Sequence, residues 1–138
     1  MKDTELKEAR DRDLFECYQN ALREREFPSQ WDAIEYVCTH EAPRFYISSR
    51  TCALLLGKLF SGEDLSHLHP LSLKRLHQLA ELYKECHNNV PNMPRTWICE
   101  IITDMPAPEF YVTKRYAARI INKEIARHNQ EKIGRMKL

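Results

Sequence analysis

A seven-residue stretch occurs twice in the chain, and this repeat constrains the fold more than any other feature of the sequence. Residues 42–48 read Ala-Pro-Arg-Phe-Tyr-Ile-Ser, and residues 107–113 read Ala-Pro-Glu-Phe-Tyr-Val-Thr. At the same offset of 65 residues and without a gap, residues 14–60 have eleven identities in 47 positions. About three identities are expected by chance at ordinary residue frequencies. The sequence therefore predicts two copies of one structural unit.

Each copy has the pattern helix, helix, connector, helix. In the first copy, apolar residues recur at helical spacing over residues 2–26, in a shorter helix after Ser29 and over residues 49–60. The second copy repeats this over residues 71–86, over residues 97–103 and in a final helix that follows Thr113 and reaches about residue 132. Ser29, Ser48 and Thr113 directly precede three of these helices, and their hydroxyl oxygens can accept hydrogen bonds from N–H groups in the first turn.

The predicted fold class is therefore all-α, with two tandem three-helix units. Residues 1–62 form the first unit, residues 63–70 are a linker, and residues 71–138 form the second unit with a basic C-terminal helix. The linker is short and polar, and a proline ends it.

The repeated stretch is predicted to be a stiff connector between the second and third helices of each unit. Its proline fixes the backbone and stops the preceding helix. Its phenylalanine is expected to fill the gap where the three helices diverge. For Tyr46 and Tyr111 two interpretations remain: a half-buried ring with its hydroxyl on the backbone, or a side chain that stacks or contacts phosphate.

Composition excludes several classes of protein. Charged residues make up 30% of the chain, the net charge is +1, and no apolar run approaches the roughly 20 residues of a membrane helix. The polar N-terminal stretch is unlike a signal peptide, so a cytoplasmic location and no membrane partner are predicted. The five cysteines include no CxxC pair and are interpreted as reduced, buried thiols.

The spacing of side chains indicates neither a catalytic site nor a metal site. His67, His69, Cys86 and His87 fit no common zinc site. No nucleophile, base and orienting group stand at recognisable intervals. The prediction is that the protein is not an enzyme, with no catalytic residues, no metal and no cofactor.

The two units resemble the helix-turn-helix superfamily in its trihelical, homeodomain- or Myb-like form. The resemblance is carried by DAIEYVCTHEAPRFYISSRTCALLLGKL and by CEIITDMPAPEFYVTKRYAARIINKEI. In each segment a helix, a turn and a Ser/Thr-capped helix with a mid-helix alanine follow one another. This fold-level resemblance implies that the third helix of a unit reads DNA in the major groove.

Positive charge is concentrated in the final helix. Residues 114–138 contain eight Lys and Arg and two acidic residues, a net charge of +6, which leaves −5 for the rest of the chain. Arg and Asn suit base edges, and Lys suits phosphates. The predicted DNA-binding residues are Lys114, Arg115, Arg119, Asn122, Lys123 and Arg127, together with Tyr111 and Arg50.

The third helix of the first unit is less basic. Leu54 stands where the second copy has Arg119, and Gly57 stands where it has Asn122. This face is better suited to packing on the other unit, on another subunit or on a partner protein. The predicted function is therefore a small DNA-binding protein, a regulator or a DNA-processing accessory factor that binds duplex DNA. The alternative is a helical protein-interaction adaptor that binds no nucleic acid.

Overall fold

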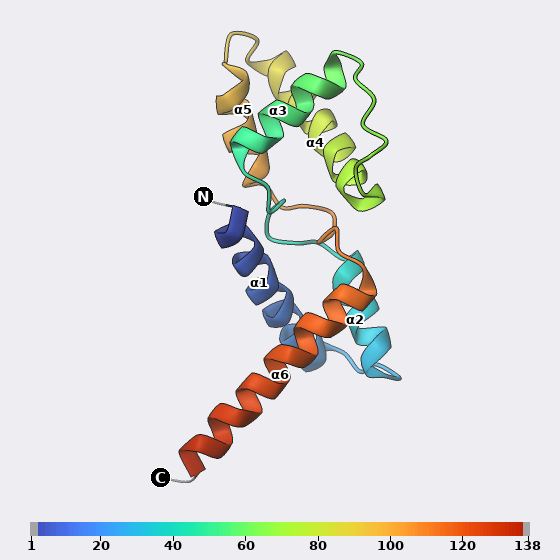
Figure 1. The fold of residues 1–138 in the computed structure, drawn as a ribbon, viewed down its shortest axis with the longest axis vertical. Coiled ribbons are helices and arrows are strands. Elements are labelled where there is room, and N and C mark those ends of the chain that lie inside the picture. The colour runs from blue at the N-terminus through green and yellow to red at the C-terminus, as the bar shows by residue number, and fades with distance from the viewer. Residues whose placement is uncertain (1–2, 137–138) are drawn as a thin grey trace.

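The structure is a computed structural model that describes residues 3–136, and it is all-helical (Figure 1). The described residues form six helices and no β-strand, as the sequence predicts for an all-α chain. In chain order the helices are α1 (Asp3–Glu24), α2 (Gln30–Thr39), α3 (Ser49–Phe60), α4 (Pro70–Asn89), α5 (Arg95–Thr103) and α6 (Lys114–Met136).

Side-chain caps fix the starts of three of these helices. The backbone N–H of Asp32 donates to Ser29 Oγ at 3.2 Å, and that of Thr51 donates to Ser48 Oγ at 3.1 Å. The N–H of Tyr116 donates to Thr113 Oγ1 in the same way, also at 3.1 Å. Each bond satisfies a helix N–H that has no partner within the helix, which is why the helix begins there.

The helices pack in two groups of three, and this grouping differs from the predicted division of the chain. One group contains α1, α2 and α6, and the other contains α3, α4 and α5 (Figure 1). Within the described residues, α3 makes no contact with α1 or α2, and α6 makes none with α4 or α5. The segments 1–62 and 71–138 are therefore not separate packing units, and the predicted linker 63–70 connects α3 to α4 within one group, with Pro70 already part of α4.

The third helix of each repeat copy, α3 or α6, packs in the group that contains helices of the other copy. The physical cause of this exchange is the path of the two connectors. They run past each other between the two groups instead of turning back on their own helices. Ala42 and Ala107 form an antiparallel bridge in which the N–H of each donates to the carbonyl of the other, both at 2.9 Å. Each connector thus carries the chain from one group to the other.

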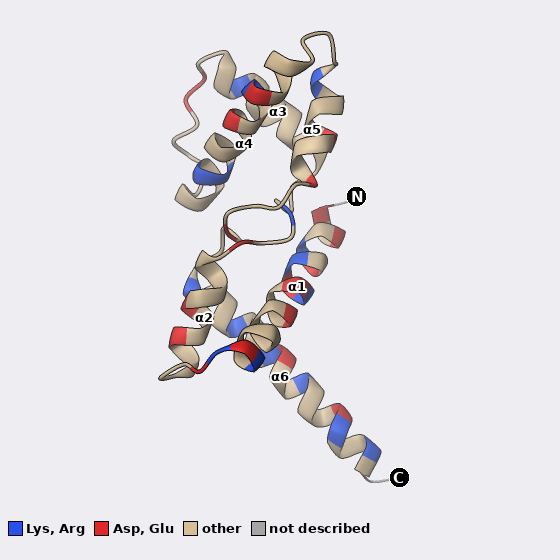
Figure 2. Ribbon diagram, turned by 180° about the vertical axis from the view of Figure 1, so that it is seen from behind, with Lys and Arg blue, Asp and Glu red and all other residues tan. Residues whose placement is uncertain are grey.

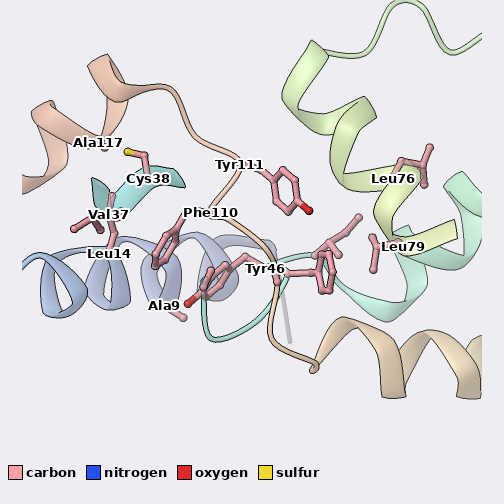
Figure 3. Close-up of a cluster of buried hydrophobic side chains, with 14 of the residues drawn as sticks. Ala9, Leu14, Val37, Cys38, Tyr46, Leu76, Leu79, Phe110, Tyr111 and Ala117 are labelled. Atoms are coloured by element: carbon pink, nitrogen blue, oxygen red, sulfur yellow. The ribbon is translucent and has the colours of Figure 1, made fainter. Parts of the chain in front are cut away.

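Aromatic rings from the two connectors stack on one another at this crossing. Phe45 stacks with Tyr111, with ring centroids 6.1 Å apart. Tyr46 stacks with Phe110, with ring centroids 5.9 Å apart (Figure 3). All four side chains are buried. Phe45 and Phe110 were predicted to fill the gap among the three helices of their own unit. In the structure each packs instead against the tyrosine of the other connector.

Both tyrosines adopt a left-handed backbone conformation. Tyr46 has φ of 54° and Tyr111 has φ of 57°. A bulky residue rarely adopts positive φ, and such strain costs about 1–3 kcal/mol where the surroundings enforce it. The bridge and the stacked rings supply that enforcement.

Candidate nucleic-acid interface

Helix α6 buries one narrow face near its start and leaves the rest of its surface partly or fully exposed. Ala117, Ile120 and Ile121 are the buried residues, and they pack against α1 and α2. Every residue from 126 to 136 is exposed, although the ring centroid of His128 still lies 5.1 Å from that of Phe15 on α1, and the end of the helix projects beyond the group (Figure 1). Basic side chains recur along the whole helix (Figure 2).

Arg115 and Arg119 are the two cations best placed to meet a phosphate backbone. Both side chains are exposed and lie one helical turn apart. They line a hollow of about 410 Å³ with Thr113 and Tyr116, and no carboxylate lines it. Arg119 also lies over the ring of Tyr116, with its guanidinium carbon 5.2 Å from the ring centroid. The hollow is therefore a cationic surface with an aromatic wall.

Two other predicted residues near the start of α6, Lys114 and Asn122, have partners within the protein. Lys114 Nζ lies 2.9 Å from Glu35 Oε2 and 5.3 Å from the centroid of the Trp31 ring. Asn122 Oδ1 accepts a hydrogen bond of 2.9 Å from the side chain of Gln30 on α2. A DNA contact by Lys114 or Asn122 must compete with these partners.

The cations further along α6 face a groove that is lined by both acidic and basic side chains. Arg127 is paired with Glu124 at 2.9 Å. Lys123 and Arg127 line a groove of about 600 Å³ with α1, which contributes carboxylates to it. The positive potential there is partly neutralised by these acids. The acidic residues of the groove are Glu8, Asp11, Glu16 and Glu124.

The structure separates two predicted residues from this surface. Tyr111 is only 8% exposed, so its ring is not part of the surface formed by Arg115 and Arg119. Its burial follows from stacking on Phe45 at the connector crossing. Arg50 is exposed but belongs to α3 in the other group, so it does not join the cations of α6.

One exposed surface was not singled out by the sequence pattern. Trp97 and Ile101 lie one turn apart on α5 and are 60% and 48% exposed, and Met105 follows the helix. Ile101 and Met105 border an apolar groove of about 390 Å³ between α4 and α5, lined by Leu82, Cys86, Val90, Met93, Ile101, Ile102 and Met105 among others. Because α5 is apolar on nearly every side, its periodicity does not distinguish the buried face from this one.

Comparisons with known proteins give no relative for this chain. No family model matches it, and neither a curated protein nor a solved structure matches it. Among residues 3–136, no helix has the length and apolar character needed to cross a membrane. In the same range, no three His, Cys, Asp or Glu side chains are grouped so that they could hold a metal ion.

Proposed function

We propose that the protein binds duplex DNA through the N-terminal half of α6, as a regulator or an accessory factor of DNA processing. One observation carries this proposal. Arg115 and Arg119 are exposed, one turn apart, in a hollow whose lining includes no carboxylate. Two guanidinium groups at this spacing can bind successive phosphates or a base edge with two hydrogen bonds each.

The position of these residues within α6 supports the proposal. In helix-turn-helix proteins the N-terminal residues of the recognition helix contact bases. Arg115 and Arg119 lie in the first two turns of α6, whose N-terminus adds a partial positive charge of its own. In this chain α6 packs on α2, a helix from the other copy of the repeat, so the pair analogous to a helix-turn-helix is assembled from both copies.

Titration of a fluorescently labelled duplex at two salt concentrations tests the proposal. With about four phosphate contacts, affinity falls by about 100-fold between about 50 mM and about 200 mM salt, because each contact releases counterions. An absence of binding at the lower salt concentration would contradict the proposal. We place this activity in the cytoplasm, where the five free cysteines stay reduced.

Protein binding is the second candidate function, and the apolar surface of α5 favours it. Trp97, Ile101 and Met105 are large, apolar and exposed, and Leu54 on α3 is 60% exposed. Exposed aromatic and Met side chains are enriched at protein interfaces. In this case, truncating Trp97 would abolish partner binding, whereas the duplex titration would show no salt-dependent affinity.

A further inference from the structure

Two buried polar atoms beside the connector crossing have no hydrogen-bond partner. They are the hydroxyl oxygen of Tyr111 and Nε of Arg75, which belongs to α4. Within residues 3–136, Arg75 forms no ion pair with a carboxylate. Burial lowers the pKa of Arg75, and the charge of Arg10 lowers it further. Arg75 is partly buried, and a buried, unpaired Nε on a cation without a counter-charge is costly, so an external anion would stabilise this site.

The other copy of the repeat shows how the same pair of groups is satisfied internally. Arg10 and Tyr46 precede Arg75 and Tyr111 by 65 residues each. Arg10 is paired with Asp11, with Nε 3.3 Å from Oδ1. The hydroxyl of Tyr46 donates to Asp13 Oδ2 at 2.6 Å.

The second copy keeps the cation and the hydroxyl but lacks both carboxylates. The positions that correspond to Asp11 and Asp13 are occupied by Leu76 and Gln78. Glu109, whose charge raises the pKa of Tyr111, is itself paired with a lysine, Lys74. The negative charge that the first copy provides from α1 is thus missing from α4.

A hollow of about 270 Å³ adjoins this site on the side of Tyr111, and Arg75 is not one of its lining residues. Tyr111 lines it, and so do Arg10 and Ser72, which precedes Arg75 by one helical turn. The hollow lies at the N-terminus of α4, whose backbone dipole favours negative charge there. The remaining lining residues are His69, Leu71, Val112, Thr113 and Tyr116.

The groups around the hollow are suited to donate hydrogen bonds. Burial, with the charge of Glu109, raises the pKa of Tyr111 to about 12, so the phenol keeps its proton at neutral pH. Arg10, which lines the hollow and is paired with Asp11 through Nε, carries only donors, and Ser72 can donate. Arg75 lies one helical turn beyond Ser72 and also carries only donors. An oxyanion with several acceptor oxygens fits this set better than a halide or a neutral ligand.

We propose that a phosphate-class oxyanion, either free phosphate or the phosphate group of a small phosphomonoester, binds between Arg75 and Tyr111 at the N-terminus of α4. Figure 3 shows Tyr111 on the α4 side of the crossing and Tyr46 on the α1 side. The site is separate from the α6 surface, because it contains neither Arg115 nor Arg119. It would hold the two connectors and α4 together when occupied.

Thermal unfolding with inorganic phosphate, at ionic strength matched with sodium chloride, tests this inference. At saturating phosphate the wild-type Tm is expected to rise by about 5 °C, because the anion binds the folded state only. Gln78→Asp restores the carboxylate that the first copy has, and it should abolish the phosphate-dependent rise. Arg75→Gln, which removes the cation, should abolish it as well.

Tyr46→Phe is the control from the other copy of the repeat, because Tyr46 corresponds to Tyr111 but its hydroxyl is already bonded to Asp13. It should keep the full phosphate response, and so should Arg115→Ala with Arg119→Ala, which separates this site from DNA binding. A nucleoside monophosphate tested in parallel distinguishes the two sources: tighter binding than inorganic phosphate assigns the site to a phosphomonoester. Equal Tm shifts in the wild type, Gln78→Asp and Arg75→Gln would overturn the proposal, because they would reflect only the general effect of phosphate on folding.

Discussion

Replacement of Arg115 and Arg119 together by alanine is expected to abolish most of the affinity for duplex DNA. A guanidinium that makes two hydrogen bonds to a base contributes about 1–3 kcal/mol, so loss of both weakens binding by about 2–6 kcal/mol. This corresponds to a decrease of about 30-fold or more in affinity. Fluorescence anisotropy with the wild type in parallel measures the change.

The same double variant should remain folded. Both side chains are exposed, so the free energy of unfolding is expected to change by less than about 1 kcal/mol. The control variant is Arg23→Ala with Lys84→Ala, which removes the same charge from exposed positions outside α6. A comparable loss of affinity in the control would mean that net charge, and not the α6 surface, determines binding.

Replacement of Phe45 by alanine is expected to destabilise the whole chain. Phe45 is 2% exposed and stacks on Tyr111 at the connector crossing. Removal of a buried phenylalanine costs about 3–5 kcal/mol, a large part of the roughly 5–15 kcal/mol that stabilises a typical domain. Urea unfolding followed by circular dichroism measures the loss.

Because each connector joins both helix groups, the two groups should lose stability together in a single transition. Phe60 at the end of α3 is 40% exposed, and Phe60→Ala should cost clearly less. Two separate unfolding transitions, with only one of them shifted in the Phe45 variant, would show that the groups are independent and that the crossing does not couple them.

Local sequence signals predicted the helices well. The starts of α2, α3 and α6 follow Ser29, Ser48 and Thr113, and each of these side chains accepts the capping hydrogen bond expected of it. The range 49–60 expected for the third helix is the observed one. Capping depends on a side chain and a backbone N–H a few residues away, so it can be read without knowledge of the tertiary structure.

The exchange of α3 and α6 between the two groups could not be predicted in this way. Cys52 and Leu56 are buried in α3, and Ala117 and Ile121 are buried at the corresponding positions of α6. Helical periodicity shows which face is buried but not which of two similar partners covers it. The choice depends on the path of the connectors, and the bridge between Ala42 and Ala107 joins residues far apart in the chain.

The candidate sites were predictable to different extents. Exposure of Arg115 and Arg119 follows from their position opposite the apolar face of the final helix, and they are exposed in the structure. Burial of Tyr111 depends on the crossing, so its separation from the exposed cations of α6 could not be predicted from the sequence. Arg75 was missed, although it follows Arg10 by 65 residues and a comparison extended to this position would have found it.

The most direct test of the central claim, that the exposed face of α6 contacts DNA, is a map of the contact surface in solution. Titration of a short duplex into ¹⁵N-labelled protein should shift the amide signals of residues 113–123 and the side-chain Nε signals of Arg115 and Arg119. Signals from Trp97 and Ile101 on α5 should remain in place. Shifts confined to α3 and α5, or no shift at a saturating concentration of duplex, would contradict the claim.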